Sequence, residues 1–271
     1  MAESAYGELS REFETINVYR REAGATIELN RPASRNAWSN QFSLDLLDAV
    51  RATGDDQSVR AVMITGAGKA FSSGADLKEA QAEGRAMDPY QRLTERYHPI
   101  ITGVRQMPKP VVAAVHGAAA GIGLSLALAC DLIVAAESAY FMLAFVNIGL
   151  VPDGGSSLLV PSRVGFARAA EMAMLGERIS ARQAVDWGLI NRAWPDEEFA
   201  AQTDELVTRL ANGPTRSLAG IKRQLNRWLY ERMDDQLEFE AHLQQEMGGS
   251  ADFAEGVLAF TERRPARFAG R

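Results

Sequence analysis

Cysteine is nearly absent from this sequence: Cys130 is the only one among 271 residues. A single thiol excludes an intramolecular disulfide framework and a cysteine-ligated metal site, and we expect no bound metal. Cys130 ends the apolar segment 124–130, so we interpret it as a small core residue rather than as a nucleophile.

Positive charge is also in deficit, with 29 Lys and Arg against 35 Asp and Glu and a net charge of −6 at pH 7. Binding to a phosphate backbone requires a basic face, so nucleic acid is not expected as a partner. Long apolar runs are missing too: none reaches the ~18 residues that a membrane span requires, and the N-terminus has no basic-then-apolar leader pattern. We therefore expect no membrane association and a cytoplasmic location.

What the sequence does have is an alternation of strand and helix patterns. With 271 residues, 46% of them hydrophobic, the chain can bury a large core. Period-two alternation predicts a hairpin of 16–19 and 25–29, and apolar runs predict strands at 61–65, 110–115, 131–135 and 190–194. Helical periodicity predicts helices over about 40–54, 89–107 and 121–130. Beyond Pro195 it predicts only helices, over 196–211, 214–230, 234–247 and 251–263.

The predicted helix over 234–247 carries a broad, partly apolar face. Its residues at helical spacing are Leu237, Ala241 and Gln244 on one side and Phe239, Leu243 and Met247 on the other. Such a face suits a helical appendage that packs on another subunit, and a solvated face is the alternative.

Two Gly-rich turns, around Gly74 and Gly121, each follow a predicted strand. The second opens a helix, where the first N–H groups lack internal partners and carry the positive end of the helix dipole. A carbonyl oxygen docked there would be stabilised as it became an oxyanion, and the N–H of Ala75 could supply a second donor. Close packing of helix on strand without a ligand is the alternative. The glycine spacing matches neither the dinucleotide fingerprint nor the phosphate-binding loop.

Asp153 lies in a third turn, between Pro152 and a Gly-Gly pair. The functional interpretation is a general base held over an apolar pocket, where burial raises the pKa of the carboxyl toward the working range. The alternative is a helix N-cap or turn aspartate. The residues expected to line the pocket are Phe141, Met142, Phe145 and Leu150.

Taken together, these motifs resemble the crotonase (enoyl-CoA hydratase/isomerase) family. The matching segments are Ile64–Lys78, Lys109–Gly117, Ala127–Asp131, Leu175–Ala181 and Glu255–Phe260, followed by Arg263-Arg-Pro265. The resemblance implies an α/β fold of the crotonase/ClpP-like kind, a spiral of ββα turns, over residues 11–200. It also implies an all-helical C-terminal trimerisation region over residues 201–271, and a homotrimer or a dimer of trimers.

The same resemblance implies an acyl-CoA thioester as the ligand, with coenzyme A entering as part of the substrate and no separate cofactor. By position, the oxyanion donors are the N–H groups of Ala75 and Ile122, each next to a glycine of its turn, Gly74 or Gly121. Ile122 replaces the family's usual glycine, which keeps the backbone donor and narrows the space beside the thioester.

The resemblance also implies which residues contact coenzyme A. Adenine would lie against the loop around Ala37 and the backbone of Asp76 and Leu77. Arg35 and Lys78 would contact the phosphates. The remaining candidates for substrate contact are Ser73, Trp38, Phe260 and Arg263. For Trp38, packing in the core is an equal alternative, whereas Phe260 and Arg263 would reach the site from a neighbour or a lid.

The chain departs from the family at two positions that decide the chemistry. Hydratases of this family use two glutamates to place and polarise a water, where this chain has Ser125 and Phe145. The stretch Phe141–Asp153 instead resembles the ring-enoyl-CoA isomerases of the phenylacetate pathway, which carry a single aspartate. One carboxylate suffices for an isomerase that moves a proton through a dienolate, and a dry pocket beside Phe145 protects that intermediate.

The sequence therefore predicts an enoyl-CoA isomerase with Asp153 as the only acid/base. Three alternatives stay open. The first is an enoyl-CoA hydratase that works with Asp153 alone or with a partner not visible in the sequence. The second is acyl-CoA dehalogenation or hydrolysis, in which Asp153 attacks directly and His98 is the base. The third is an acyl-CoA-binding homologue that has lost its catalysis.

Overall fold

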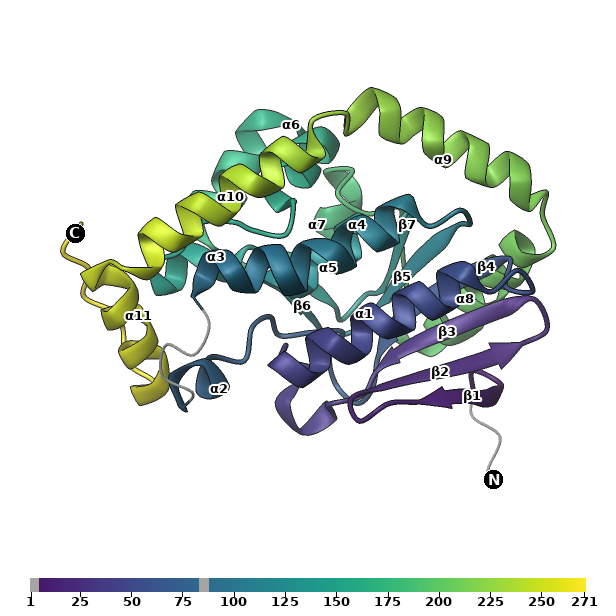
Figure 1. Cartoon of the computed structure of the whole chain (residues 1–271), viewed down its shortest axis with the longest axis horizontal. Coiled ribbons are helices and arrows are strands. Elements are labelled where there is room, and N and C mark those ends of the chain that lie inside the picture. Colours follow the sequence, from purple (N-terminus) through teal and green to yellow (C-terminus); the bar gives the residue numbers. More distant parts are fainter. Residues whose placement is uncertain (1–4, 83–87) are drawn as a thin grey trace.

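The computed structural model describes residues 5–82 and 88–271, and its centre is a mixed sheet (Figure 1). In spatial order its strands are β1 (Glu8–Glu12), β2 (Ile16–Arg21), β3 (Gly24–Leu29), β4 (Ala61–Gly66), β5 (Val111–Val115), β7 (Leu132–Ala136) and β10 (Arg192–Trp194). The first three strands pair antiparallel, and every pairing from β3 to β10 is parallel. A smaller sheet joins β6 (Ala118–Ala120), β8 (Tyr140–Met142) and β9 (Ile179–Ser180).

Helices cover both faces of the large sheet. They are α1 (Asn40–Asp55), α4 (His98–Gln106), α5 (Ile122–Ala129) and α8 (Asp196–Ala211). The first three pack on one face together with Val62 and Ile64 of β4, and α8 packs on the other face together with Ala61 and Met63. Successive side chains of a strand point to opposite faces, so a fully apolar strand needs cover on both sides. This layered arrangement is the α/β class that the sequence predicts.

Most elements predicted from the sequence are present, and one is interrupted. Ser39 caps α1, since its hydroxyl accepts a hydrogen bond from the N–H of Phe42 at 3.1 Å. The helix predicted over 89–107 is divided into α3 (Pro89–Arg92), the π-helical turn η2 (Leu93–Tyr97) and α4. Pro99 follows this turn and has no N–H to continue a regular ladder, which accounts for the break.

The C-terminal part of the chain is helical, as predicted. After α8 come α9 (Thr215–Leu229), α10 (Met233–Gly248) and α11 (Ala251–Glu262). The predicted boundary between residues 200 and 201 falls inside α8, which covers the sheet, and the division there stays a prediction. The shorter or intervening elements are η1 (Pro32–Ser34), α2 (Leu77–Ala82), η3 (Ala144–Ile148), α6 (Ser156–Leu175) and α7 (Ala181–Asp186).

One side of α10 differs from the expectation of a face for another subunit. Leu237, Ala241 and Gln244 are buried within their own chain, where α10 packs against α3, η2 and α6. Helical spacing identifies such a stripe but not the surface that covers it. Phe239, on the other side, is 56% exposed, so this second side of the helix is the one that faces outward.

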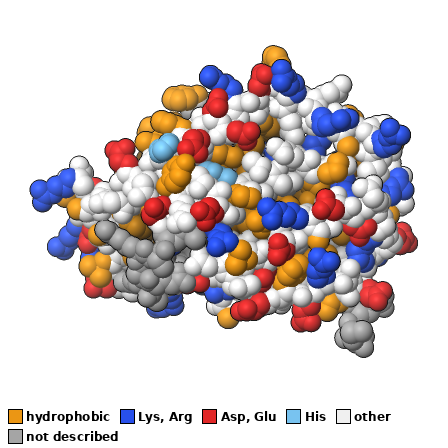
Figure 2. Space-filling model, in the orientation of Figure 1, with side chains coloured by type: hydrophobic (Ala, Val, Ile, Leu, Met, Phe, Trp, Pro, Cys, Tyr) orange, Lys and Arg blue, Asp and Glu red, His pale blue; other side chains and the backbone are white. Residues whose placement is uncertain are grey.

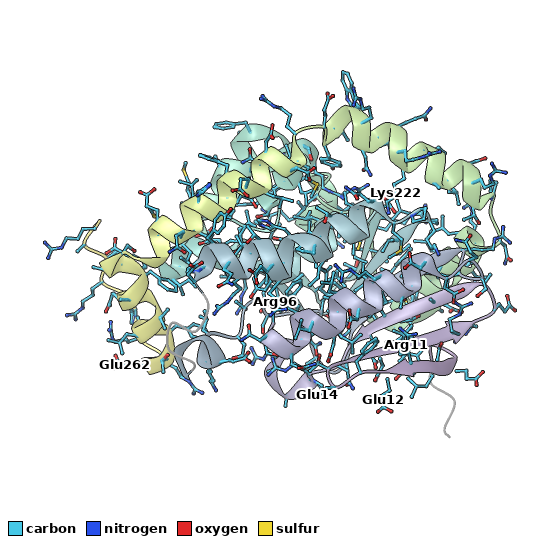
Figure 3. All side chains as sticks on the ribbon, in the orientation of Figure 1. Arg11, Glu12, Glu14, Arg96, Lys222 and Glu262 are labelled. Atoms are coloured by element: carbon cyan, nitrogen blue, oxygen red, sulfur yellow. The ribbon has the colours of Figure 1, made fainter. Side chains whose placement is uncertain are left out.

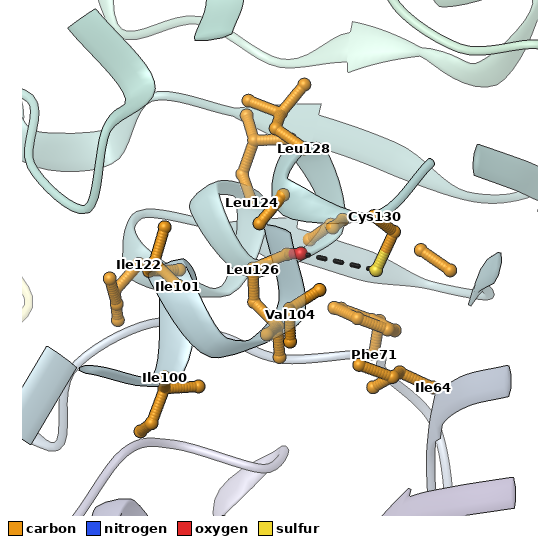
Figure 4. Packing of buried hydrophobic residues seen from close by; sticks show 14 of the residues in the cluster. Ile64, Phe71, Ile100, Ile101, Val104, Ile122, Leu124, Leu126, Leu128 and Cys130 are labelled. Carbon is orange, nitrogen blue, oxygen red and sulfur yellow. Dashed lines mark hydrogen bonds between the residues drawn. The ribbon is translucent and has the colours of Figure 1, made fainter. Parts of the chain in front are cut away.

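Cys130 lies inside the core, as the sequence predicts. Its buried sulfur lies 3.5 Å from the carbonyl oxygen of Leu126 (Figure 4). Burial raises the pKa of the thiol to about 12, so it is not a nucleophile near neutral pH. The same view shows Ile122 beside Ile101, which places the start of α5 against α4.

The visible surface mixes both signs of charge. Figure 2 shows acidic and basic side chains interspersed over one face of the molecule. No helix within residues 5–82 and 88–271 is long and apolar enough to cross a membrane. In the same two stretches, no group of three or more His, Cys, Asp and Glu side chains is placed to hold a metal ion.

Candidate functional site

The two Gly-rich turns predicted from the sequence meet in the structure. A Cβ added to Gly121 would lie 3.7 Å from the Cα of Gly74, and one added to Gly74 would lie 3.0 Å from the carbonyl oxygen of Ala120. Both glycines adopt positive φ, which other residues rarely tolerate. The positive φ therefore favours glycine at both positions, and at Gly74 the close approach of the Ala120 carbonyl does so as well.

The N–H groups next to these glycines are left without a protein acceptor. Trp38 pairs with the residues that flank Ala75: its N–H donates to the carbonyl of Gly74 at 2.8 Å, and its carbonyl accepts from the N–H of Asp76 at 3.0 Å. In such a parallel bridge the N–H of Ala75 points away from Trp38. Ile122 opens α5, whose first N–H groups have no partner inside the helix. Across the described residues neither N–H has an acceptor, so both are open to a bound oxygen atom.

Two apolar side chains border these turns. The ring of Phe145, on η3 and 6% exposed, lies 3.9 Å from the position of a Cβ on Gly121. The Cδ1 of Ile122 occupies the place that a Cβ on Gly154 would take. The side chain of Ile122 therefore packs directly against the turn that carries Asp153. It fits there because Gly154, the residue after Asp153, has no side chain.

Asp153 is buried with its two carboxylate oxygens in different states. It is 5% exposed, and its Oδ2 accepts a hydrogen bond from the Nε2 of Gln244 at 2.8 Å. Its Oδ1 is also buried and has no hydrogen-bond partner among the residues described. A carboxylate with one fixed and one unsatisfied oxygen is arranged to exchange a proton with a bound molecule.

Burial controls the charge of this carboxyl. The pKa of Asp153 is raised to about 8: burial is the largest cause, the negative charge of Glu240 adds to the rise, and the hydrogen bond from Gln244 opposes both. The rise agrees with the expectation from the apolar turn. Tyr97 of η2 shares the same environment, because burial raises the pKa of its phenol and the charge of Asp153 adds to that rise.

Ser125, which stands where hydratases of the family carry a glutamate, forms a hydrogen bond to the Asp153 turn. It is fully buried on α5, and its hydroxyl donates to the main-chain carbonyl of Asp153 at 2.8 Å. The hydroxyl of Ser156 donates to the same carbonyl at 2.8 Å. The main chain at Asp153 is thus tied to two helices, α5 and α6.

Gln244 and Glu240 contact the Asp153 turn from α10, although the sequence indicated no role at this site for either and Gln244 was expected on a face for another subunit. Both are buried, and the separation along the chain between Gln244 and Asp153 is 91 residues. A signal was present: the two polar residues are four apart and share the apolar stripe of Leu237 and Ala241. Polar residues inside such a stripe must find partners when the stripe is buried.

The loops predicted to contact adenine and phosphate are joined to each other. The guanidinium of Arg31, another residue the sequence analysis passed over, bonds to the carbonyl of Ala37 and to the carboxylate of Asp76. The N–H of Ser73 donates to the carbonyl of Arg35 at 3.0 Å. Leu77 opens α2, and the side chains of Arg35 and Lys78 are exposed beside these loops. The predicted contacts to coenzyme A are therefore adjacent, and their roles stay predictions.

Trp38 lies in the core. Its ring centroid is 5.5 Å from that of Phe42 and 5.0 Å from that of Tyr97, and its Nε1 is buried without an acceptor among the described residues. This environment fits the core-packing alternative for Trp38. It also links the adenine loop to Tyr97, and through it to the region of Asp153.

Phe260 and Arg263 lie at the end of α11 and are exposed. Their helix packs on η3 of the same chain, since a Cβ on Gly256 would lie 2.6 Å from the main chain of Ile148. The segment that carries Phe145 is thereby covered by the C-terminal helix of its own chain.

Known proteins resemble this chain over nearly its whole length. The model of the family described as enoyl-CoA hydratase/isomerase matches residues 20–271. A protein of Rhodobacter capsulatus named “probable enoyl-CoA hydratase” is 44% identical over 260 residues, which are 96% of this chain and 99% of that protein. The 1,2-epoxyphenylacetyl-CoA isomerase of Escherichia coli is 38% identical over 248 residues, 91% of this chain and 95% of the isomerase. A crystal structure of an enoyl-CoA hydratase from Mycobacterium avium subsp. paratuberculosis matches with a TM-score of 0.87 and 38% identity, covering 95% of this chain and 100% of that one.

Proposed function

Because the chain belongs to the enoyl-CoA hydratase/isomerase family, also called the crotonase family, we propose that it shifts a double bond in an enoyl-CoA thioester, with Asp153 as its only acid/base. Membership of the family supports acyl-CoA as the class of substrate. The observation that carries the choice of isomerase is the Asp153 carboxyl, which is buried with one oxygen held by Gln244 and the other unsatisfied within the described structure.

The reaction needs one group that acts first as a base and then as an acid. The thioester oxygen accepts hydrogen bonds from the N–H groups of Ala75 and Ile122, which stabilise the charge as it develops. The ionised Asp153 removes a proton from the α or γ carbon, and the electron pair of that C–H bond enters the dienolate. Protonated Asp153 then returns the proton to the other carbon. No atom is gained or lost, so we propose no cofactor beyond the coenzyme A of the substrate.

A second buried carboxylate lies near Asp153, but its oxygens are occupied. The Oε2 of Glu240 accepts from the N–H of Gly155 at 2.7 Å, and its Oε1 accepts from the N–H of Ser157 at 3.0 Å and from the Ser157 hydroxyl. Both oxygens of Glu240 are thus directed at the start of α6, whereas a second base would have to present an oxygen to a bound water. This use of Glu240 supports the one-carboxylate isomerase over a two-carboxylate hydratase.

A hydratase that uses Asp153 alone is the second candidate, and the name of the Rhodobacter capsulatus relative favours it. Dehalogenation with His98 as the base has less support. Burial lowers the pKa of His98 to about 4, so the ring is neutral near pH 7. The carboxylate whose charge raises the pKa of this ring is that of Glu238 on α10. The contacts of Asp153 involve Gln244, Ser125 and Ser156 instead.

We further propose that coenzyme A lies across the loops 31–38 and 73–78, which Arg31 ties together. Exposed Arg35 and Lys78 would bind its phosphates. A homotrimer or a dimer of trimers is proposed as the assembly, as the family resemblance implies, and the large apolar side chains exposed on α6 and α9 support self-association.

The decisive experiment compares positional isomerisation with water addition. Purified wild-type protein and the variant Asp153→Asn are incubated with 2-enoyl-CoA and 3-enoyl-CoA thioesters, and NMR in D2O separates migrated double bonds from hydroxyacyl products. We expect isomerisation by the wild type and a loss of about 10³-fold in the variant, since the general acid/base is removed. The wild-type kcat/KM should rise with pH through about 8, because the base must be ionised.

The matched control is Asp204→Asn, which removes an exposed carboxylate on α8 that is paired with Arg21. It should retain wild-type turnover. Full isomerase activity in Asp153→Asn would overturn the proposal, and hydroxyacyl-CoA as the main product would favour the hydratase. Tight thioester binding without any turnover would favour the non-catalytic homologue.

A further inference from the structure

Helix α10 reaches the carboxyl of Asp153 through a single side chain. Gln244 is 2% exposed, and its Nε2 donates one hydrogen bond to the Oδ2 of Asp153 at 2.8 Å and another to the carbonyl of Val151 at 2.9 Å. The carbonyl of Val151 carries no proton, so the amide can satisfy it only with its NH₂ group, which then also donates to Asp153. The two contacts therefore fix the orientation of the amide, and the amide fixes the carboxylate.

Glu240, one helical turn earlier on α10, fixes the main chain that follows Asp153. Its carboxylate accepts from the N–H groups of Gly155 and Ser157, at the start of α6. These N–H groups have no partner within α6, so the carboxylate caps the helix from another element. The same helix face thus holds the side chain of Asp153 and the turn that carries it.

We propose that Gln244 is a positioning residue for Asp153, which holds Oδ2 and leaves Oδ1 free to meet the substrate, and that Glu240 fixes the turn beneath it. This inference rests on the proposed function, because it assigns Asp153 as the group that acts on substrate. It adds that the acid/base is set by α10, a helix about 90 residues away in sequence.

The two α10 residues act on the charge of Asp153 in opposite directions. The hydrogen bond from Gln244 favours the carboxylate and lowers its pKa, while the negative charge of Glu240 raises it. From η2, the phenol of Tyr97 also faces this group. The helices α5 and α6 contribute the uncharged hydroxyls of Ser125 and Ser156. Opposite shifts are therefore expected from the two α10 substitutions.

The test uses the variants Gln244→Met and Glu240→Gln in the full-length protein. The pKa of Asp153 is read directly by ¹³C NMR of carboxyl-labelled aspartate without substrate, with Asp153→Asn to assign the resonance. We expect the pKa to rise by about one unit in Gln244→Met and to fall in Glu240→Gln. In the pH profile of kcat/KM for enoyl-CoA, the acidic limb should shift in the same two directions. At the plateau of the profile, kcat should fall at least ~10-fold in Gln244→Met.

The matched control is Glu246→Gln, which removes an exposed carboxylate from the same helix and should leave the pKa and the profile unchanged. A merely structural role for Gln244 would lower stability without moving the pKa, and an unchanged pKa in Gln244→Met overturns the inference. Methionine is close to glutamine in size, so this variant decides the matter even if Glu240→Gln does not fold. Opposite pKa shifts in a protein that isomerises no thioester would contradict the proposed function and leave the positioning role intact.

Discussion

At the scale of single residues, Asp153 combines function with a cost in stability. Its pKa is about 8 in the folded chain against an ordinary value of 3.8. Between these values the folded state holds a proton that the unfolded state has released, so this group makes stability fall as pH rises from about 4 to 8. A buried acid that must ionise to work therefore destabilises the fold at working pH.

Asp153→Asn should remove this dependence, because asparagine has nearly the shape of the protonated acid and does not titrate. We expect the variant to gain stability over the wild type as pH rises from 5 to 8, by a few kcal/mol or several degrees in Tm. Thermal unfolding of both proteins across this range measures the difference, in which the titrating groups that do not interact with Asp153 cancel. Parallel curves of Tm against pH would show that Asp153 is not the group that titrates here.

At the scale of elements, α9 is held by buried polar contacts. The ammonium of Lys222 lies 2.8 Å from a carboxylate oxygen of Asp131 and donates to the carbonyl of Val104 at 2.9 Å. Asp131 is also paired with Arg105, whose guanidinium lies 2.9 Å away. Figure 3 shows Lys222 on the side of α9 that faces the core, while Ile221, Leu225 and Trp228 are exposed.

Lys222→Met should therefore loosen α9 although methionine is similar in shape to the lysine stem. The substitution removes one partner of a buried ion pair: Asp131 keeps the hydrogen bond from the N–H of Val111 but loses the ammonium, and the carbonyl of Val104 loses its side-chain donor. We expect a loss of about 3 kcal/mol in the free energy of unfolding. Urea denaturation measures it. Arg223→Met, one residue along on the exposed side of α9, is the control and should stay within about 0.5 kcal/mol of the wild type.

The contact of α11 with η3 depends on a glycine. A Cβ on Gly256 would lie 2.6 Å from the main chain of Ile148, so Gly256→Ala must push α11 away from the segment that carries Phe145. We expect a loss of about 1–3 kcal/mol in stability and a lower kcat, as the apolar wall beside the oxyanion donors shifts. Calorimetry and turnover on enoyl-CoA measure the two effects.

The control for this substitution is Gly220→Ala in α9. No atom of the described structure lies within 4 Å of a Cβ at that position. Alanine should stabilise the helix there by about 0.5–1 kcal/mol and leave turnover unchanged. Equal effects of the two substitutions would show that α11 does not depend on close contact at Gly256.

At the scale of the whole molecule, the exposed apolar surface predicts self-association. Phe166 of α6 and Trp228 of α9 are each 83% exposed, and Met174 of α6 is 72% exposed. Large exposed apolar surfaces often mark sites of protein association. We therefore expect self-association, and the resemblance to the family implies an assembly of three chains of 29.5 kDa, or twice that number.

Trp228→Asp should reduce the mass of this assembly toward that of one chain, because a charge in an apolar interface must be desolvated without a partner. Light scattering coupled to size-exclusion chromatography measures the mass. The control is Leu44→Asp on α1, where the side chain is less exposed than that of Trp228, and this substitution should leave the mass unchanged. A wild-type protein that elutes as a monomer at micromolar concentration would contradict the expectation.

The sequence alone determined the features that depend on local chemistry. Alternation of apolar residues determined the hairpin of β2 and β3, and apolar residues at helical spacing determined α1. The glycines at 74 and 121 and the turn of Asp153 were visible because positive φ and close approach leave few residues to choose from. Each of these signals is contained in a few neighbouring residues.

Only the tertiary structure decided what surrounds Asp153. Gln244 and Glu240 lie 91 and 85 residues from their partners in the turn, and their stripe looked like a face for another subunit. In the sequence, Ser125 indicated only that a glutamate is missing, whereas in the structure its hydroxyl donates a hydrogen bond to the carbonyl of Asp153. Periodicity states which side of a helix is buried, but the partner of a buried polar group depends on which elements pack together. That choice is made by the whole chain, and it sets the charge of the one carboxyl on which the proposed chemistry depends.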